Sequence, residues 1–291
     1  MTVPLLNRLV PSRWPIAVKL STTLLTVALL PMGLTTYLNL RASMADVEAT
    51  AYENIELLAM GQSAQLDQLI VAHRRIVEYL AKDPIVVDFR TPDADRASRQ
   101  AEVDLALARL QNLDPSYDLA YLIDVQGRGA AAPGLPTVIG NDLRFRAYFQ
   151  EPQRTGQSYV SSILVGTNTN QPGLYFSAPV KSEQGDFLGV AVIKMNGELI
   201  WQIVDELEHQ TSPNQGAFLI DQAGIVIAHP NRDWLYQSLG TLEPAVATQV
   251  RRDRRYAVDT IPSLGLDTLA SAMVGAETSG YVAYQRPDHP Q

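Results

Sequence analysis

The stretch from residue 140 to residue 195 decides the fold that we expect for this chain. It begins GNDLRFRAYFQEPQRTG (140–156), continues SYVSSILVGTNTNQPGLYFSAPV (158–180) and closes FLGVAVIKM (187–195). The first part has a helix-like pattern, and three strand-like runs follow it, separated by Gly, Pro, Asn and Asp residues that favour turns. This order predicts an α+β fold built on antiparallel strands.

Three basic residues stand out within this stretch. Arg144 and Arg146 lie two apart beside three aromatic residues, and Lys194 lies in a run, Leu188–Met195, that is otherwise apolar or Gly. A lysine in a buried strand must find an anion, reach solvent or lose its charge. An anionic ligand held between Arg146 and Lys194 would satisfy both side chains. The alternatives are a surface position for Arg144, a structural ion pair for Arg146 and a solvent-reaching side chain for Lys194.

Other residues of the stretch can complete such a site. Arg146 can give a carboxylate two parallel hydrogen bonds, whereas Lys194 supplies a point charge. Thr167 and backbone N–H groups near Gly166 can add further donors. Tyr148 and Tyr175 can form walls with a polar tip, although side chains of this kind also serve as core.

The composition excludes several classes of function. The chain has 291 residues, a net charge of −8 and no cysteine. The acidic balance argues against a nucleic-acid partner, and the lack of cysteine excludes disulfides and thiolate chemistry. The run RRDRR (251–255) is interpreted as a solvated helix face. The four histidines are scattered without metal-ligand spacing, and no nucleophile, metalloprotease or phosphate-loop motif is present, so we expect no metal, no cofactor and no catalytic residue.

The N-terminal part predicts a membrane anchor. Residues 20–40 carry no charged side chain and would form a helix roughly 30 Å long, enough to cross a bilayer. Basic residues precede this segment and acidic ones follow it, so residues 1–19 are expected to be cytoplasmic and the chain after Arg41 is expected to lie outside. The alternative is a cleaved signal peptide ending near residue 45.

Two helices are predicted next. Apolar residues recur at steps of three and four through residues 45–82, which is typical of a long amphipathic helix suited to a stalk, and Asp83-Pro84 ends it. A second helical pattern covers residues 96–113 and stops at Asp114-Pro115.

An internal repeat follows these helices. AYLID (120–124) with its later Gly127 is matched by AFLID (217–221) with Gly224, at a constant offset of 97 residues. Each copy predicts a strand, an Asp-x-x-Gly turn and a returning strand. We therefore expect two tandem modules, residues 83–200 and 201–291. Residues 280–284 match the first module's third strand, and two further strands have no counterpart, so the second module is expected to be incomplete.

Together these motifs resemble the double-Cache (PAS-like) sensor domains of bacterial receptors. The resemblance implies two tandem PAS-like modules outside the membrane, a small ligand in the membrane-distal module, and output through a histidine kinase of a two-component system, a cyclase or a chemotaxis receptor. Two anchored copies are expected to form a homodimer.

Within that family, the motifs look most like those of dicarboxylate sensor kinases. The R-P-Y-F motif of those kinases is matched by Arg146-Ala147-Tyr148-Phe149, their Gly-Thr by Gly166-Thr167 and their strand lysine by Lys194. Leu143 stands where an aromatic residue is usual. The resemblance implies a carboxylate ligand. The alternatives are an amino acid or amine, an anchored hydrolase acting on an anionic substrate, and a structural envelope module that binds nothing.

Overall fold

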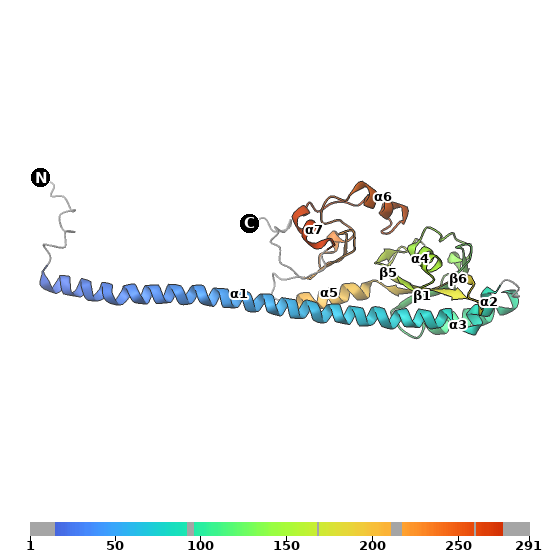
Figure 1. Ribbon diagram of the computed structural model, residues 1–291, viewed down its shortest axis with the longest axis horizontal. Helices are drawn as coiled ribbons and strands as arrows, with labels where there is room; N and C mark the ends of the chain where they lie inside the picture. The colour runs from blue at the N-terminus through green and yellow to red at the C-terminus, as the bar shows by residue number, and fades with distance from the viewer. Residues whose placement is uncertain (1–14, 92–95, 168, 211–216, 259, 276–291) are drawn as a thin grey trace. The chain divides into compact units, whose positions relative to one another are not determined.

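The computed structural model describes residues 15–91, 96–167, 169–210, 217–258 and 260–275 (Figure 1). Its contacts divide the chain into two units, Met1–Ser63 and Ala64–Gln291. The predicted match of residues 280–284 to the first module lies outside the described residues.

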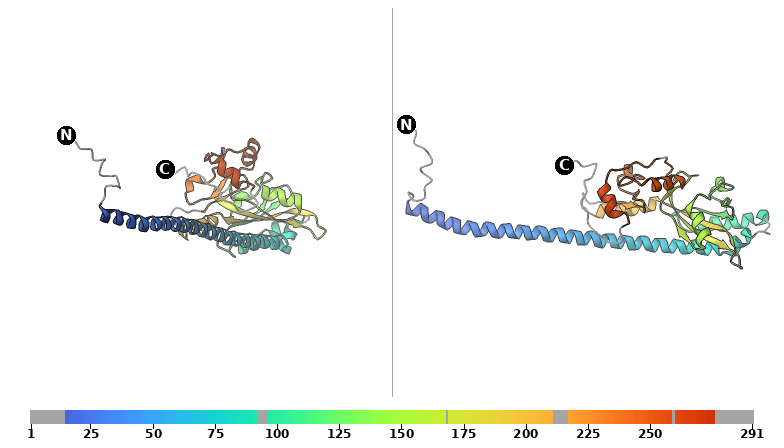
Figure 2. Two further views of the ribbon diagram at one scale, coloured as in Figure 1. Left: turned by 60° about the vertical axis from the view of Figure 1, so that its left-hand side comes forward. Right: turned by 45° about the horizontal axis from the view of Figure 1, so that its top comes forward.

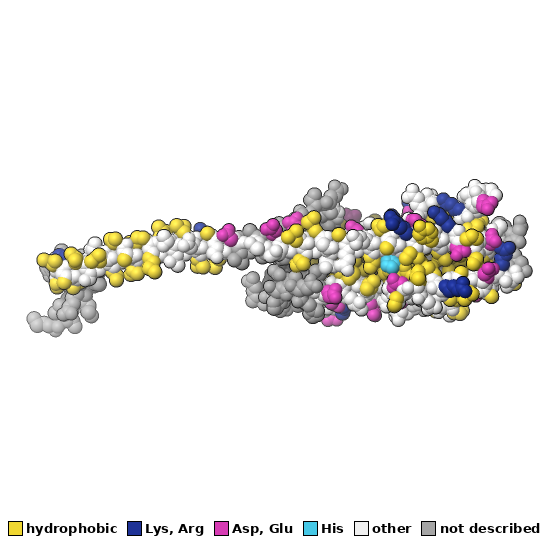
Figure 3. Space-filling model, turned by 90° about the horizontal axis from the view of Figure 1, so that it is seen from below, with side chains coloured by type: hydrophobic (Ala, Val, Ile, Leu, Met, Phe, Trp, Pro, Cys, Tyr) yellow, Lys and Arg dark blue, Asp and Glu magenta, His cyan; other side chains and the backbone are white. Residues whose placement is uncertain are grey.

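In the first unit, the described residues from Ile16 onward form the N-terminal part of one helix, α1 (Ile16–Ala81). Its segment Ile16–Met44 is long and apolar enough to cross a membrane, with a mean hydropathy of 1.6, and apolar side chains cover it in the view of Figure 3. The sequence predicted a span and a stalk as two helices. The structure joins them because the linking residues 41–44, RASM, include neither Gly nor Pro to interrupt a helix.

The C-terminal part of α1 is one wall of the second unit. Leu66, Leu69 and Ile76 pack on the core that contains the fully buried Val77. The helix ends before Asp83, as predicted. Asp83 then caps a short helix that the sequence analysis did not place, α2 (Pro84–Arg90), by accepting a 2.9 Å hydrogen bond from the backbone N–H of Ile85.

Helix α3 follows at Arg96–Gln111 and agrees with the predicted helix to within two residues. Val103 and Leu107 are fully buried on its inner face. Helices α1, α2 and α3 therefore form one layer over the sheet that comes next in the chain (Figure 2).

The sheet is antiparallel throughout its named strands, with the order β2-β1-β6-β5-β3 and β4 paired to β5. The bounds are β1 Tyr117–Asp124, β2 Gly129–Ala131, β3 Tyr159–Val160, β4 Leu164–Val165, β5 Pro172–Lys181 and β6 Phe187–Asn196. This confirms the α+β class with antiparallel strands.

The two faces of the sheet belong to different cores. On β6, Ala191, Ile193 and Met195 face the helical layer, whereas Val190 and Val192 face helix α4 (Ala147–Thr155). This alternation follows from the two-residue period of a strand. Lys194 has the parity of Val190 and Val192, so it lies on the α4 face.

The remainder of the second unit carries a smaller sheet. Its elements are α5 Glu198–Gln210, β7 Leu219–Ile220, β8 Val226–Ala228, the short 3-10 helix η4 Arg232–Trp234, α6 Pro244–Arg252 and α7 Asp267–Met273. Another 3-10 helix, η3 Pro136–Val138, lies between β2 and α4. β7 and β8 form an antiparallel pair.

The two hairpins of the sequence repeat have the same local structure. In the first, the Asp124 carboxylate accepts from the N–H groups of Gln126 and Arg128 at 2.9 and 2.8 Å. In the second, Asp221 accepts from residues 223 and 225 at 2.9 and 3.0 Å. Gly127 and Gly224 both have a φ of 77°, which glycine adopts without strain. The repeated aspartates are therefore turn residues in both copies.

Candidate functional site

Arg146 is the centre of the candidate site. It stands at the N-cap of α4, and only 2% of the residue is exposed. Its Nη1 donates to the backbone carbonyls of Asp253 at 3.1 Å and Arg254 at 3.3 Å, and its Nη2 donates to that of Val165 at 3.1 Å. A guanidinium has five N–H donors, and backbone carbonyls occupy three of them here.

The two remaining donors of Arg146 are its Nε–H and one Nη2–H. The Nε atom is buried and has no hydrogen-bond partner; among the described side chains only the Tyr236 hydroxyl shares that condition. Nε and a neighbouring Nη of the planar guanidinium form a fork that matches the two oxygens of a carboxylate. The three carbonyl bonds hold the guanidinium in place and leave this fork open.

A small cavity adjoins Arg146 on the α4 side of the sheet. It leaves about 20 Å³ for the centres of water molecules, which is room for about one water. Its lining comprises Leu119, Tyr121, Leu135, Val138, Leu143, Arg146, Tyr148, Gly166, Thr167, Thr169 and Tyr175. An organic ligand therefore requires the surrounding loops to move apart.

Three tyrosines form the polar wall of this cavity. The rings of Tyr148 and Tyr175 are stacked with centroids 4.8 Å apart, and Tyr121 meets Tyr148 edge-on at 6.5 Å. Burial raises the pKa of all three hydroxyls, against an opposing effect of the nearby Arg146 charge. The hydroxyls therefore stay protonated at neutral pH and can donate to an anion.

Lys194 forms an ion pair within the protein. Its side chain is fully buried, and its Nζ lies 2.7 Å from a carboxylate oxygen of Asp118 and 3.5 Å from the hydroxyl of Thr169. Strand β1 has a bulge here, because Tyr117 pairs with Met195 while Leu119 pairs with Lys194. The extra residue is Asp118. Lys194 does not line the cavity, although it is paired across the sheet with the cavity residue Tyr175.

Gly166 and Thr167 lie at the cavity, but the Gly166 N–H is not available to a ligand. It donates to the Gln171 carbonyl at 3.0 Å. A Cβ on Gly166 would come within 2.4 Å of the Thr169 hydroxyl and 2.9 Å of the Tyr175 hydroxyl, so a larger residue at this position would displace one of these two side chains. Thr167 is exposed and lines the cavity.

Arg144 does not join this group of residues. It is exposed and makes a two-point ion pair with Asp142, with Nε and Nη2 at 3.0 and 2.7 Å from the two carboxylate oxygens. These hydrogen bonds hold the pKa of Asp142 well below its usual range. Arg144 borders a different, open groove with Asp253.

The segment Asp253–Tyr256, hereafter the 253–256 segment, contacts Arg146 through two backbone carbonyls. Besides the bonds to Arg146, the Arg255 carbonyl accepts from the Val165 N–H at 2.7 Å. The sequence analysis treated residues 251–255 as a solvated helix face. That interpretation is wrong beyond the end of α6, because Asp253 is buried and its carbonyl contacts Arg146.

Sequence reasoning brought together Arg146, Tyr148, Gly166, Thr167 and Tyr175, all of which line the cavity. It did not name Tyr121, Thr169 or Asp118 as part of the site. Tyr121 could have been found from strand parity, because it lies in the repeated AYLID strand. No cluster of three or more His, Cys, Asp or Glu side chains that could hold a metal occurs in the described part of the chain.

A family model for the Cache domain matches residues 43–285. The chain belongs to the Cache domain family. This confirms the resemblance seen in the sequence, and it identifies the chain as a sensor domain of the kind found in membrane-bound signalling receptors rather than an enzyme.

Several solved structures are similar to this chain. The sensor domain of the V. cholerae histidine kinase DctB has 24% sequence identity and a TM-score of 0.61, covering 73% of this chain and 80% of that one. The ligand-binding domain of the P. aeruginosa PAO1 amino acid chemoreceptor PctC, in complex with GABA, has 22% identity and a TM-score of 0.47, covering 62% and 77%. That of the C. jejuni chemoreceptor Tlp3, in complex with 4-methylisoleucine, has 18% identity and a TM-score of 0.49, covering 67% and 75%. No curated protein matches the chain.

Proposed function

We propose that this chain is the extracytoplasmic input region of a bacterial transmembrane receptor, and that it binds a small carboxylate between α4 and the sheet. The observation that carries the proposal is the open fork of Arg146, whose Nε–H is buried without a partner at the cavity. An unpaired buried donor is costly, and a carboxylate would satisfy it with two charge-assisted hydrogen bonds.

The ion pair between Lys194 and Asp118 favours a carboxylate over an amine. An ammonium ligand would need a free acidic group, and the Asp118 carboxylate already lies 2.7 Å from Lys194 Nζ. A second carboxylate on the ligand would have to share Lys194 with Asp118. Monocarboxylates and dicarboxylates should therefore differ in their dependence on Lys194.

A thermal-shift panel on the full chain in detergent tests this proposal. The panel contains acetate, succinate, glycine and putrescine, applied to the wild type, Arg146→Lys and Arg144→Lys. A carboxylate at 100 times its dissociation constant adds about 2.7 kcal/mol of stability. We expect this gain in the wild type and in Arg144→Lys, the matched control, and its loss in Arg146→Lys, which keeps the charge but removes the fork. Stabilisation by putrescine alone, or equal responses in all three proteins, would contradict the proposal.

The same proposal includes the membrane topology and the module boundaries of the chain. Residues 1–19 are cytoplasmic, residues 20–40 span the inner membrane, residues 45–82 form the stalk, and residues 83–200 and 201–291 form the distal and proximal PAS-like modules of a homodimer. The chain has no cysteine, so single-cysteine variants can report its orientation. A membrane-impermeant maleimide should label Glu183→Cys but not Ser12→Cys in spheroplasts; the reverse pattern would invert the topology.

A further inference from the structure

The guanidinium of Arg146 is held by a part of the chain that lies more than one hundred residues later. Two of its three hydrogen bonds go to the carbonyls of Asp253 and Arg254. Its third partner, Val165, is itself tied to the same segment, because the Val165 N–H donates to the Arg255 carbonyl. The orientation of the open fork therefore depends on where the 253–256 segment lies.

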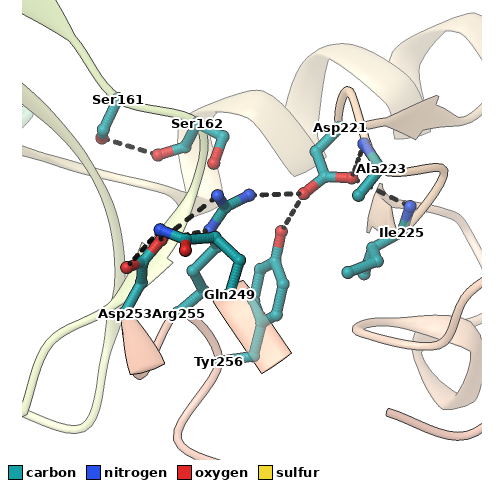
Figure 4. Close-up of polar contacts among 9 residues, drawn as sticks. All are labelled: Ser161, Ser162, Asp221, Ala223, Ile225, Gln249, Asp253, Arg255 and Tyr256. Atoms are coloured by element: carbon teal, nitrogen blue, oxygen red, sulfur yellow. Dashed lines mark hydrogen bonds and ion pairs between the residues drawn. The ribbon is translucent and has the colours of Figure 1, made fainter. Parts of the chain in front are cut away.

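The 253–256 segment is in turn anchored to the second repeat hairpin through Asp221. The Tyr256 hydroxyl donates to one Asp221 carboxylate oxygen at 2.7 Å, and Arg255 Nη1 lies 3.6 Å from the same oxygen. The Asp221 side chain is 1% exposed, and its other oxygen accepts two backbone N–H groups of its own turn. Figure 4 shows Tyr256 and Arg255 converging on this carboxylate.

The first hairpin provides an internal comparison. Asp124 makes the same two turn hydrogen bonds as Asp221, but its side chain is half-buried and no contact joins it to the 253–256 segment among the described residues. The anchoring is therefore an addition to the turn chemistry that both repeats share. Burial and the adjacent Asp221 carboxylate raise the pKa of Tyr256, so its hydroxyl remains a donor at neutral pH.

We infer that Asp221 and Tyr256 are positioning residues for the distal site: they fix the 253–256 segment, whose carbonyls aim the Arg146 fork into the cavity. The inference rests on the proposed carboxylate site. The carboxylate and the 253–256 segment both bind the Arg146 guanidinium, so the position of the segment affects the affinity for the carboxylate. Because such coupling is reciprocal, a bound carboxylate also stabilises the contact between the segment and Arg146. Ligand occupancy in the module of residues 83–200 is thereby linked to the second hairpin.

The experiment uses the full chain in detergent and two anchor variants, Tyr256→Phe and Asp221→Asn. Their matched controls are Tyr236→Phe, whose hydroxyl has no partner although its ring stacks on Tyr256 at 4.9 Å, and Asp124→Asn. Hydrogen–deuterium exchange reports the Val165 amide, which is bonded to the segment. Amides of the central β1–β6 ladder serve as the reference for global unfolding. Calorimetry measures the affinity for acetate and succinate.

We expect Val165 exchange to accelerate about tenfold relative to the β1–β6 amides in the anchor variants, the effect of one lost hydrogen bond to a charged group, while the Val165 amide of both controls keeps its rate. Carboxylate affinity should fall by a similar factor only in the anchor variants. Unchanged Val165 exchange in both anchor variants overturns the inference, as does faster exchange with unaltered affinity. If neither carboxylate binds the wild type, the proposed ligand is wrong, and faster Val165 exchange in the anchor variants then still supports the role of Asp221 and Tyr256 in holding the 253–256 segment.

Discussion

The buried ion pair between Lys194 and Asp118 leads to an asymmetric prediction. The Lys194 side chain is fully buried, whereas 23% of the Asp118 side chain is exposed. Asp118→Asn leaves an ammonium group in the interior without an anion. Lys194→Met fills the same volume with an apolar side chain and leaves a carboxylate that already reaches water.

The magnitudes follow from the geometry. At a separation of 2.7 Å, the attraction is about 6 kcal/mol for an effective dielectric constant near 20, and it offsets a desolvation cost of several kcal/mol for Lys194. Loss of one partner of a buried pair costs about 3–5 kcal/mol, so we expect Asp118→Asn to lower the free energy of unfolding by about 3 kcal/mol, since the Asn oxygen still accepts a hydrogen bond. For Lys194→Met we expect a change of about 1 kcal/mol or less.

Urea unfolding of the detergent-solubilised chain, followed by the fluorescence of Trp201 and Trp234, measures both changes. The double variant provides the control for the mechanism. Adding Lys194→Met to Asp118→Asn should restore most of the lost stability, because it removes the unpaired charge. Equal effects of the two single changes, or no recovery in the double variant, would refute the idea that Asp118 is what allows Lys194 to be buried and charged.

Three further predictions concern single residues. Tyr236→Phe should raise the free energy of unfolding by about 1 kcal/mol in the same assay, because the buried Tyr236 hydroxyl has no hydrogen-bond partner. A decrease in the free energy of unfolding would contradict this, because it would mean that the hydroxyl makes a stabilising hydrogen bond. Burial lowers the pKa of His73 in the folded protein, so the unfolded chain binds a proton at a higher pH than the folded chain does. The melting temperature should therefore fall as the pH drops below about 6.5, and His73→Gln should reduce this dependence of the melting temperature on pH. Gly166→Ala should weaken carboxylate binding, since its Cβ would displace the Thr169 side chain at the cavity; unchanged affinity by calorimetry would show that Gly166 does not form part of the site.

Local patterns accounted for much of the fold and for the part of the site that lies in one stretch of sequence. Strand parity places Tyr175 on the cavity face, and the turn before its strand, which contains Gly166, is marked by polar residues, so Arg146, Gly166 and Tyr175 could be grouped before the structure was known. Periodicity alone could not pair Lys194 with Asp118. A bulge shifts the β1 register by one residue, and bulges of this kind leave no signature in the sequence.

The contacts of the 253–256 segment with Arg146 were also beyond prediction, for a different physical reason. The acceptors are backbone carbonyls, and every residue has one, so the residue types in RRDRR (251–255) carry no information about this contact. The charges of these residues instead predicted solvent-exposed side chains. Arg254 and Arg255 are indeed charged, but the Arg254 carbonyl contacts the site regardless of its side chain. Long-range contacts made by backbone groups depend on chain geometry rather than on residue type.

The backbone geometry at Arg254 supports a role for this contact beyond simple packing. Arg254 has a φ of 48°, in the left-handed region that a non-glycine residue enters at a cost of about 1 kcal/mol or more. This turn of the chain lets the successive carbonyls of residues 253 and 254 converge on one nitrogen, Nη1 of Arg146. The charge-assisted hydrogen bonds, and the position of the Arg254 guanidinium 5.4 Å from the Phe145 ring centroid, offset that cost. The strained conformation thus occurs at the residue whose carbonyl accepts a hydrogen bond from Arg146, which is where the proposed carboxylate site requires a conformational constraint.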